Sequence, residues 1–133
     1  MKYFSLMLFS LLILSGASVK GQQEDQRLKL LYWNQSVTPR DTVAITIDEM
    51  LKDPVITCSP NDFQIKSFDI VAIKEDDLMV INNSGGQLSV SSINGIKSFT
   101  PGTRFWIEHL ELTIETKGGR TIIPMPTMRF VVK

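Results

Sequence analysis

From residue 42 onward, hydrophobic and polar residues alternate in short runs, the pattern of β-strands with one buried face. Val43, Ile45 and Ile47 alternate with more polar or smaller residues, and this period of two is typical of a half-buried strand. Similar runs cover Phe105–Glu115 and Met128–Val132. We therefore expect six or seven short strands, arranged as an all-β, immunoglobulin-like antiparallel β-sandwich.

Two of the longer runs change phase once. In residues 63–72 the apolar positions are odd up to Ile65 and even from Phe68, and in residues 105–114 they are odd up to Ile107 and even from Leu110. One extra residue in a strand turns every later side chain to the other face. Each change of phase therefore predicts a β-bulge, near Lys66-Ser67 and near Glu108-His109, or a strand that passes from one sheet to the other.

Proline and glycine residues divide the runs. Pro124 and Pro126 remove two donors from one side of an extended strand, so we expect residues 122–127 at a sheet edge, at a bulge or at a crossing between sheets. Gly118-Gly119 offers the positive φ that a tight hairpin needs. Further turns are expected where turn-forming residues cluster: Glu75–Asp77, Asn82–Gly86 and Thr100–Gly102. Ile47–Lys52 is expected to form a brief helix that Pro54 stops.

The N-terminal segment predicts export. Lys2 precedes an apolar run from Tyr3 to Leu14, which small and polar residues follow. This run is shorter than the roughly 20 residues that a helix needs to cross a bilayer. We interpret residues 1–21 as a signal peptide cleaved before Gln22, with an uncleaved membrane anchor as the alternative. The protein is then expected to be periplasmic or secreted, with no stable membrane insertion after cleavage.

The remaining chain is divided into residues 22–41, a polar lead-in with a first strand at Leu28–Trp33, and residues 42–133, the β-sandwich domain. Cleavage also removes Lys2 and Lys20, which leaves 12 basic residues against 14 acidic ones. No basic cluster stands out, so the sequence gives no reason to expect nucleic-acid binding.

Groups that could carry chemistry are few. His109 is the only histidine and Cys58 the only cysteine, whereas a zinc site needs three or four ligands and nucleophilic catalysis needs a supported base. We therefore expect no enzyme, no cofactor and no metal site. Cys58 is expected to be a buried thiol, with an intermolecular disulfide as the alternative.

Aromatic residues suggest where the protein binds. Trp33, Trp106 and His109 are the tentative binding surface. Tyr32, Trp33 and Trp106 could also stack on sugars, which makes a ligand-binding or glycan-binding module the alternative function. Against both interpretations, aromatic side chains often fill the core instead.

Residues 47–133 resemble the C-terminal domain family of the gliding-motility protein GldM, a periplasmic component of the type IX secretion machinery. The resemblance is carried by Ile47–Leu51, Phe63–Phe68, Asn94–Ile96, Thr100–Phe105, Gly118–Arg120 and Phe130–Val132. It implies an immunoglobulin-like β domain that works through protein contacts and has no catalytic residues. The chain lacks the membrane helix and coiled region of the full motor component, so the resemblance implies a stand-alone exported relative. Its expected partner is another envelope protein, and homo-oligomerisation is left open.

Overall fold

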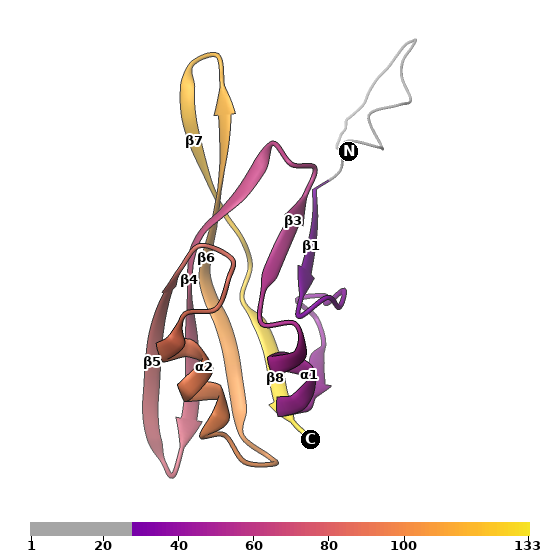
Figure 1. The fold of residues 1–133 in the computed structure, drawn as a ribbon, viewed down its shortest axis with the longest axis vertical. Helices are drawn as coiled ribbons and strands as arrows, with labels where there is room; N and C mark the ends of the chain where they lie inside the picture. The colour runs from indigo at the N-terminus through magenta and orange to yellow at the C-terminus, as the bar shows by residue number, and fades with distance from the viewer. Residues whose placement is uncertain (1–27) are drawn as a thin grey trace.

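Eight β-strands and two helices form residues 28–133, the part of the chain that the computed structural model describes (Figure 1). The expected all-β sandwich is confirmed. The expected signal peptide, residues 1–21, and the start of the lead-in lie outside the described residues. In chain order the elements are β1 (Lys29–Tyr32), β2 (Thr42–Ile45), α1 (Ile47–Lys52), β3 (Ile56–Ser59), β4 (Phe63–Lys74), β5 (Asp77–Ser84), α2 (Val90–Lys97), β6 (Arg104–Thr116), β7 (Gly119–Pro124) and β8 (Met128–Val132).

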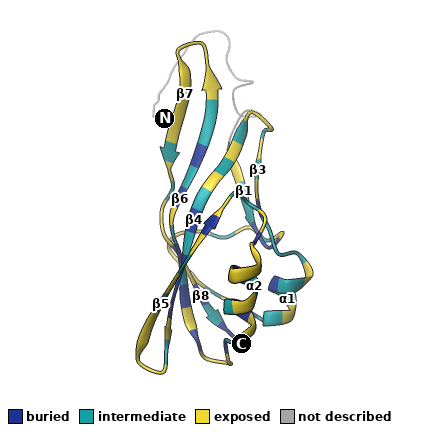
Figure 2. Cartoon of the chain, turned by 60° about the vertical axis from the view of Figure 1, so that its left-hand side comes forward, coloured by how far each residue is buried: buried dark blue, intermediate teal, exposed yellow. Residues whose placement is uncertain are grey.

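The strands form two sheets of unequal size. The large sheet has the order β2-β8-β6-β4-β5, with β7 also paired to β6, and the small sheet is the antiparallel pair β1-β3. Within the large sheet β2 and β8 run parallel, which departs from the expected antiparallel pattern, and the other pairs are antiparallel. The small sheet, α1 and α2 all lie against one face of the large sheet (Figures 1 and 2). The opposite face, here called the outer face, carries no second layer within residues 28–133.

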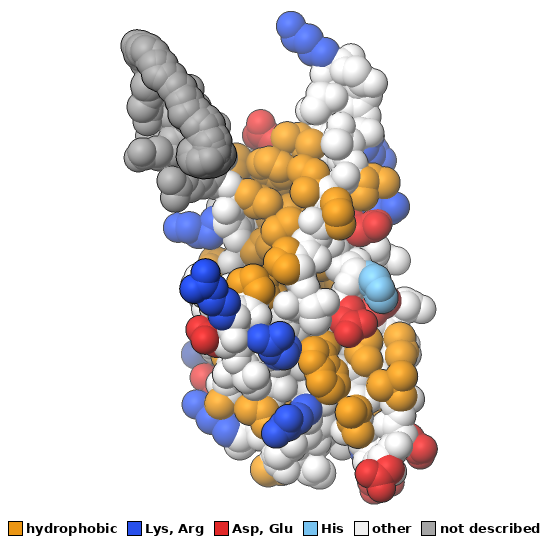
Figure 3. Space-filling model, turned by 180° about the vertical axis from the view of Figure 1, so that it is seen from behind, with side chains coloured by type: hydrophobic (Ala, Val, Ile, Leu, Met, Phe, Trp, Pro, Cys, Tyr) orange, Lys and Arg blue, Asp and Glu red, His pale blue; other side chains and the backbone are white. Residues whose placement is uncertain are grey.

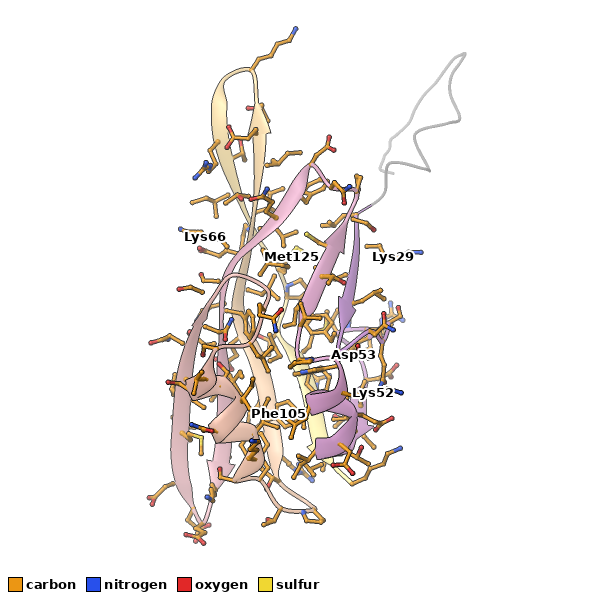
Figure 4. All side chains as sticks on the ribbon, in the orientation of Figure 1. Lys29, Lys52, Asp53, Lys66, Phe105 and Met125 are labelled. Atoms are coloured by element: carbon orange, nitrogen blue, oxygen red, sulfur yellow. The ribbon has the colours of Figure 1, made fainter. Side chains whose placement is uncertain are left out.

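Aromatic side chains fill the space between the layers. Phe105 of β6 and Phe130 of β8 are cross-strand neighbours, and their rings stack with centroids 5.0 Å apart. Trp33 stands edge-on to Phe130 at 5.0 Å, and its residue neighbour Tyr32 is fully buried. Figure 4 marks Phe105 at the level of the two helices. The sandwich core therefore begins at β1, before the residue 42 boundary that the sequence suggested.

Both predicted bulges exist, and they compensate each other. Between the cross-strand pairs Ile65–Leu112 and Asp69–Glu108 the register shifts twice. β4 carries its extra residue just after Ile65, and β6 carries its extra residue at His109, whose φ is +54°. Because each strand gains one residue, the pairing is in register again beyond the bulges, and the same face of both strands stays buried throughout.

Pro124 and Pro126 interrupt the segment that pairs with the edge of β6 opposite β4. β7 and β8 lie one after the other along one edge of β6, and the Met125 N–H donates to the Leu110 carbonyl at 2.8 Å between them. β7 pairs with β6 alone among the described strands, which confirms that Pro124 and Pro126 lie at an edge where a strand is interrupted. The buried positions also change from odd to even here, from Ile123 to Met128.

The expected helix at Ile47–Lys52 is confirmed as α1. It starts with a capping box, in which the Glu49 N–H donates to Thr46 Oγ1 at 3.0 Å and the Thr46 N–H donates to Glu49 Oε1 at 2.8 Å. Those hydrogen bonds hold the pKa of the Glu49 carboxyl below its usual value.

The segment after β4 differs from the sequence expectation. Asn82–Ser84 was predicted to be a turn, but it completes β5. Asn83 is 1% exposed, and its Oδ1 accepts from the Ser89 N–H at 2.8 Å and from Ser92 Oγ at 2.7 Å. Ser89 caps α2, a helix that the sequence did not predict. The buried Asn83 side chain thus joins α2 to β5. The sequence did not indicate this contact, because the segment around Asn83 has the composition of a turn.

Candidate functional site

Trp33 does not belong to the binding surface that the sequence suggested. Its side chain is 2% exposed, because the positive φ values of Trp33 (+52°) and Asn34 (+64°) turn the chain at the end of β1. The indole then packs edge-on against Phe105 and Phe130. Trp33 is a core residue, as the alternative interpretation of the aromatic residues expected.

Trp106 and His109 do lie on the outer face. Phe105 and Ile107 point into the core, so Trp106 between them points outward and is partly exposed. Its cross-strand neighbours are Val71 of β4 and Arg129 of β8. The outer face of the large sheet is therefore the candidate functional site, with Trp106 on its central strand.

An aliphatic cluster occupies the β4-β5 side of this face. Cross-strand pairs join Val71 to Val80 and Ile73 to Leu78, and these four residues are called the apolar patch. Ile73 is 48% exposed, Leu78 67% and Val80 53%. In Figure 3 the patch is part of the hydrophobic surface at the lower right, with acidic side chains below it. Apolar side chains gathered in this way mark an interaction surface more often than single exposed ones do.

A small pocket lies on the other side of Trp106. It has a volume of about 210 Å³ and is lined by Thr42, Arg104, Trp106, Arg129, Phe130 and Val131. We call it the arginine pocket. The Arg129 Nη2 group donates to the carbonyls of Pro39 and Arg40, both at 3.0 Å, so the loop before β2 fixes this guanidinium. The pocket therefore combines an aromatic wall with positive charge.

A row of polar side chains follows the bulges above the apolar patch. His109 Nδ1 lies 2.9 Å from Asp69 Oδ2, and the Asn82 amide donates to the other oxygen of Asp69. Lys66 and Glu111 form an ion pair at 3.4 Å. The His109 side chain is 75% exposed, and such solvated pairs contribute little to stability.

Within residues 28–133 no three His, Cys, Asp or Glu side chains gather in a way that could hold a metal ion.

Cys58 takes no part in this site. Its thiol is partly buried against the core on the small sheet and donates to the Phe63 carbonyl at 3.2 Å. Burial raises the pKa of the Cys58 thiol, which lowers its thiolate fraction and its reactivity.

Sequence reasoning missed the apolar patch and the two arginines. One signal was present in β5, where Leu78, Met79, Val80 and Ile81 are apolar at consecutive positions. A strand that is apolar on both sides predicts two contacted faces. In the fold, Met79 and Ile81 pack toward the core while Leu78 and Val80 remain exposed. The arginines carry no comparable signal, because only the pairing of β6 with β8 brings them together.

None of the helices in the described part of the chain is long and apolar enough to cross a membrane. Compared with models of protein families and with curated proteins, the chain matches none.

Proposed function

We propose that this chain is an exported, non-catalytic protein-binding and assembly module of the cell envelope, which docks a partner on the outer face of its large sheet. By its resemblance to the GldM C-terminal domain, we further propose that it serves gliding motility or type IX secretion. The observation that carries the docking proposal is the exposure of Ile73, Leu78 and Val80 side by side on two strands.

A sheet usually buries both faces unless one is polar. Here one face is covered by the helices and the small sheet, while the other combines aliphatic side chains with Trp106. Fully burying a side chain such as that of Leu78 is worth about 1.5–3 kcal/mol. Val71 of the apolar patch is already buried, so a partner that covers the patch would gain free energy mainly from Ile73, Leu78 and Val80, which are about half exposed.

The non-catalytic part of the proposal is supported by how the reactive groups lie. His109 is largely exposed and interacts with Asp69 on one face of the large sheet, whereas Cys58 lies on the small sheet. The arginine pocket contains neither of them. A catalytic site usually gathers such groups in one cleft.

A crosslinking capture from envelope extracts tests the proposal, with the mature chain as bait. The test variant is Leu78→Asp with Val80→Asp, and the matched control is Val90→Asp on α2, where the native side chain is 75% exposed. We expect the captured protein to be lost with the test variant and retained with the control. Identification of that protein as a gliding or secretion component would support the assignment to that machinery.

Two outcomes would contradict the proposal. Equal capture by the native chain, the test variant and the control variant would show that the partner does not dock on the outer face. Turnover of a substrate that stops with His109→Ala, in a variant that remains folded, would contradict the non-catalytic assignment.

A ligand-binding or glycan-binding module is the second candidate function, and the partly exposed Trp106 beside the arginine pocket favours it. Aromatic faces stack on sugar rings. Binding of a neutral oligosaccharide that is lost with Trp106→Ala, without any captured protein, would make this candidate the better one.

A further inference from the structure

We infer that the arginine pocket binds a carboxylate side chain from an acidic segment of a partner polypeptide. This inference rests on the proposed function and names the chemistry of the partner that the outer face recognises. It follows from the two arginines that line the pocket beside Trp106.

The strand pairing places both arginines next to Trp106. Arg129 is the direct cross-strand partner of Trp106, and side chains of such pairs lie in contact distance. Arg104 lies two residues before Trp106 on β6 and therefore points to the same face. The two arginines thus line one pocket together with Trp106, from two neighbouring strands.

Both guanidinium groups keep donors for a ligand. Arg129 uses one nitrogen, Nη2, for the carbonyls of Pro39 and Arg40. In the part of the chain that the structure describes, no ion pair joins Arg104 or Arg129 to an acidic side chain. The planar fork of an arginine matches the two oxygens of a carboxylate, and the backbone anchors of Arg129 orient it before a ligand arrives.

The size of the pocket indicates one side chain as its occupant. Its volume of about 210 Å³ is below the ~300–1,000 Å³ of pockets that enclose small-molecule ligands. A carboxylate on a short methylene stem fits such a space, with the methylene groups against the Trp106 ring. The rest of the partner must then lie outside the pocket, on the outer face.

The surface next to the pocket favours a polypeptide over an acidic sugar. Across β6 from Arg129 the face continues into the apolar patch, beginning with Val71, the other cross-strand neighbour of Trp106. A sugar ring would place its hydroxyl groups over these aliphatic side chains. Those hydroxyl groups would then lack hydrogen-bond partners, which is unfavourable. A peptide that carries an apolar side chain beside an acidic one satisfies both surfaces.

An NMR titration of the mature chain tests the inference with three probes: N-acetyl-glutamyl-leucine amide, its glutaminyl counterpart and glucuronate. The signals to follow are the indole N–H of Trp106 and the Nε–H of Arg104 and Arg129, with the buried indole of Trp33 as an internal control. We expect a saturable shift with the glutamyl probe and at least about tenfold weaker binding of the glutaminyl probe, since the neutral amide loses a charge-assisted hydrogen bond to the guanidinium groups. Arg104→Gln should weaken binding of the glutamyl probe by a similar factor.

The matched control variant is Arg120→Gln on β7, an exposed arginine that pairs with Glu115 at 2.7 Å. It should leave binding of the glutamyl probe unchanged. Equal binding of the glutamyl and glutaminyl probes, or no effect of Arg104→Gln, would overturn the inference. Tighter binding of glucuronate than of the glutamyl probe would show that the pocket recognises an acidic sugar and would overturn the assignment to a polypeptide.

The outcome separates this inference from the proposed function. If the glutamyl probe does not bind but capture of a partner still depends on Leu78 and Val80, the docking function is retained and the inference of a carboxylate ligand is rejected. If capture is also independent of the apolar patch, both proposals fall together.

Discussion

His109 of β6 and Asp69 of β4 meet across the point where the register of the large sheet shifts, with Nδ1 and Oδ2 2.9 Å apart. The other oxygen of Asp69 accepts from the Asn82 amide of β5. These contacts connect three strands on the outer face. They form a polar boundary between the β6-β7 hairpin on one side and the apolar patch with the arginine pocket on the other.

The backbone of His109 leads to the first prediction. Its φ of +54° lies in the left-handed region, which asparagine tolerates and β-branched residues strongly avoid. We expect His109→Asn to stay within about 0.5 kcal/mol of the native protein and His109→Val to lose about 1–2 kcal/mol of unfolding free energy. Urea denaturation measures both. Equal stability of the two variants would show that the bulge relaxes when its residue changes.

The bulges show which part of the fold could be predicted from the sequence. A buried face must stay apolar along a strand, so an inserted residue appears as a change of phase, as between Ile65 and Phe68. The paired prolines likewise restricted β7 to an edge, because a missing N–H cannot be hidden in a central strand. These features are local in the chain and leave a local pattern.

Features that depend on distant pairing could not be predicted. Whether Trp33 or Trp106 is exposed depends on which layer covers each strand, and only the tertiary fold decides that. Asn83 has the composition of a turn residue, but its role depends on Ser89 and Ser92 in the following segment. The arginine pocket needs β6 and β8 to be neighbours, although Arg104 and Arg129 are far apart in the sequence.

The β6-β7 hairpin gives the second prediction and refines an expectation from the sequence. Only Gly119 of the glycine pair has a positive φ, at +118°. Gly119→Val should therefore lower the unfolding free energy by about 1 kcal/mol or more, while Gly118→Val should lower it less. Thermal unfolding of the two single variants distinguishes them. An equal loss would mean that the turn changes its backbone conformation in the variants, since a Cβ at Gly119 would meet no atom within 4 Å and one at Gly118 only the Thr116 hydroxyl at 4.0 Å.

Export provides the third prediction. The expected cleavage falls before Gln22, and β1 begins at Lys29, so removal of residues 1–21 leaves every described strand intact. N-terminal sequencing of the protein recovered from the envelope should start at Gln22. Recovery of chains that retain Met1 in the membrane fraction would instead support the uncleaved anchor.

Tyr32 gives the last prediction, which concerns alkaline pH. Its side chain is fully buried, and its hydroxyl has no hydrogen-bond partner among residues 28–133. Burial raises the pKa of Tyr32 to about 12 from its usual 10.0. The folded state therefore retains a proton that the unfolded state loses above pH 10, so the contribution of this group to stability is complete below that pH and falls as the pH rises through the folded pKa.

We expect the native mature chain to lose roughly 1–3 kcal/mol of unfolding free energy through Tyr32 between pH 10 and pH 12. Tyr32→Phe should remove this part of the alkaline loss. At neutral pH the same variant should be as stable as the native protein or slightly more stable, because it deletes a buried hydroxyl without leaving a partner unpaired. Denaturation curves across this pH range measure both effects, and tyrosinate absorbance reports Tyr32 directly, since the other tyrosine, Tyr3, lies in the expected signal peptide. An identical alkaline decline in the Phe variant would show that Tyr32 ionises without opposing the fold.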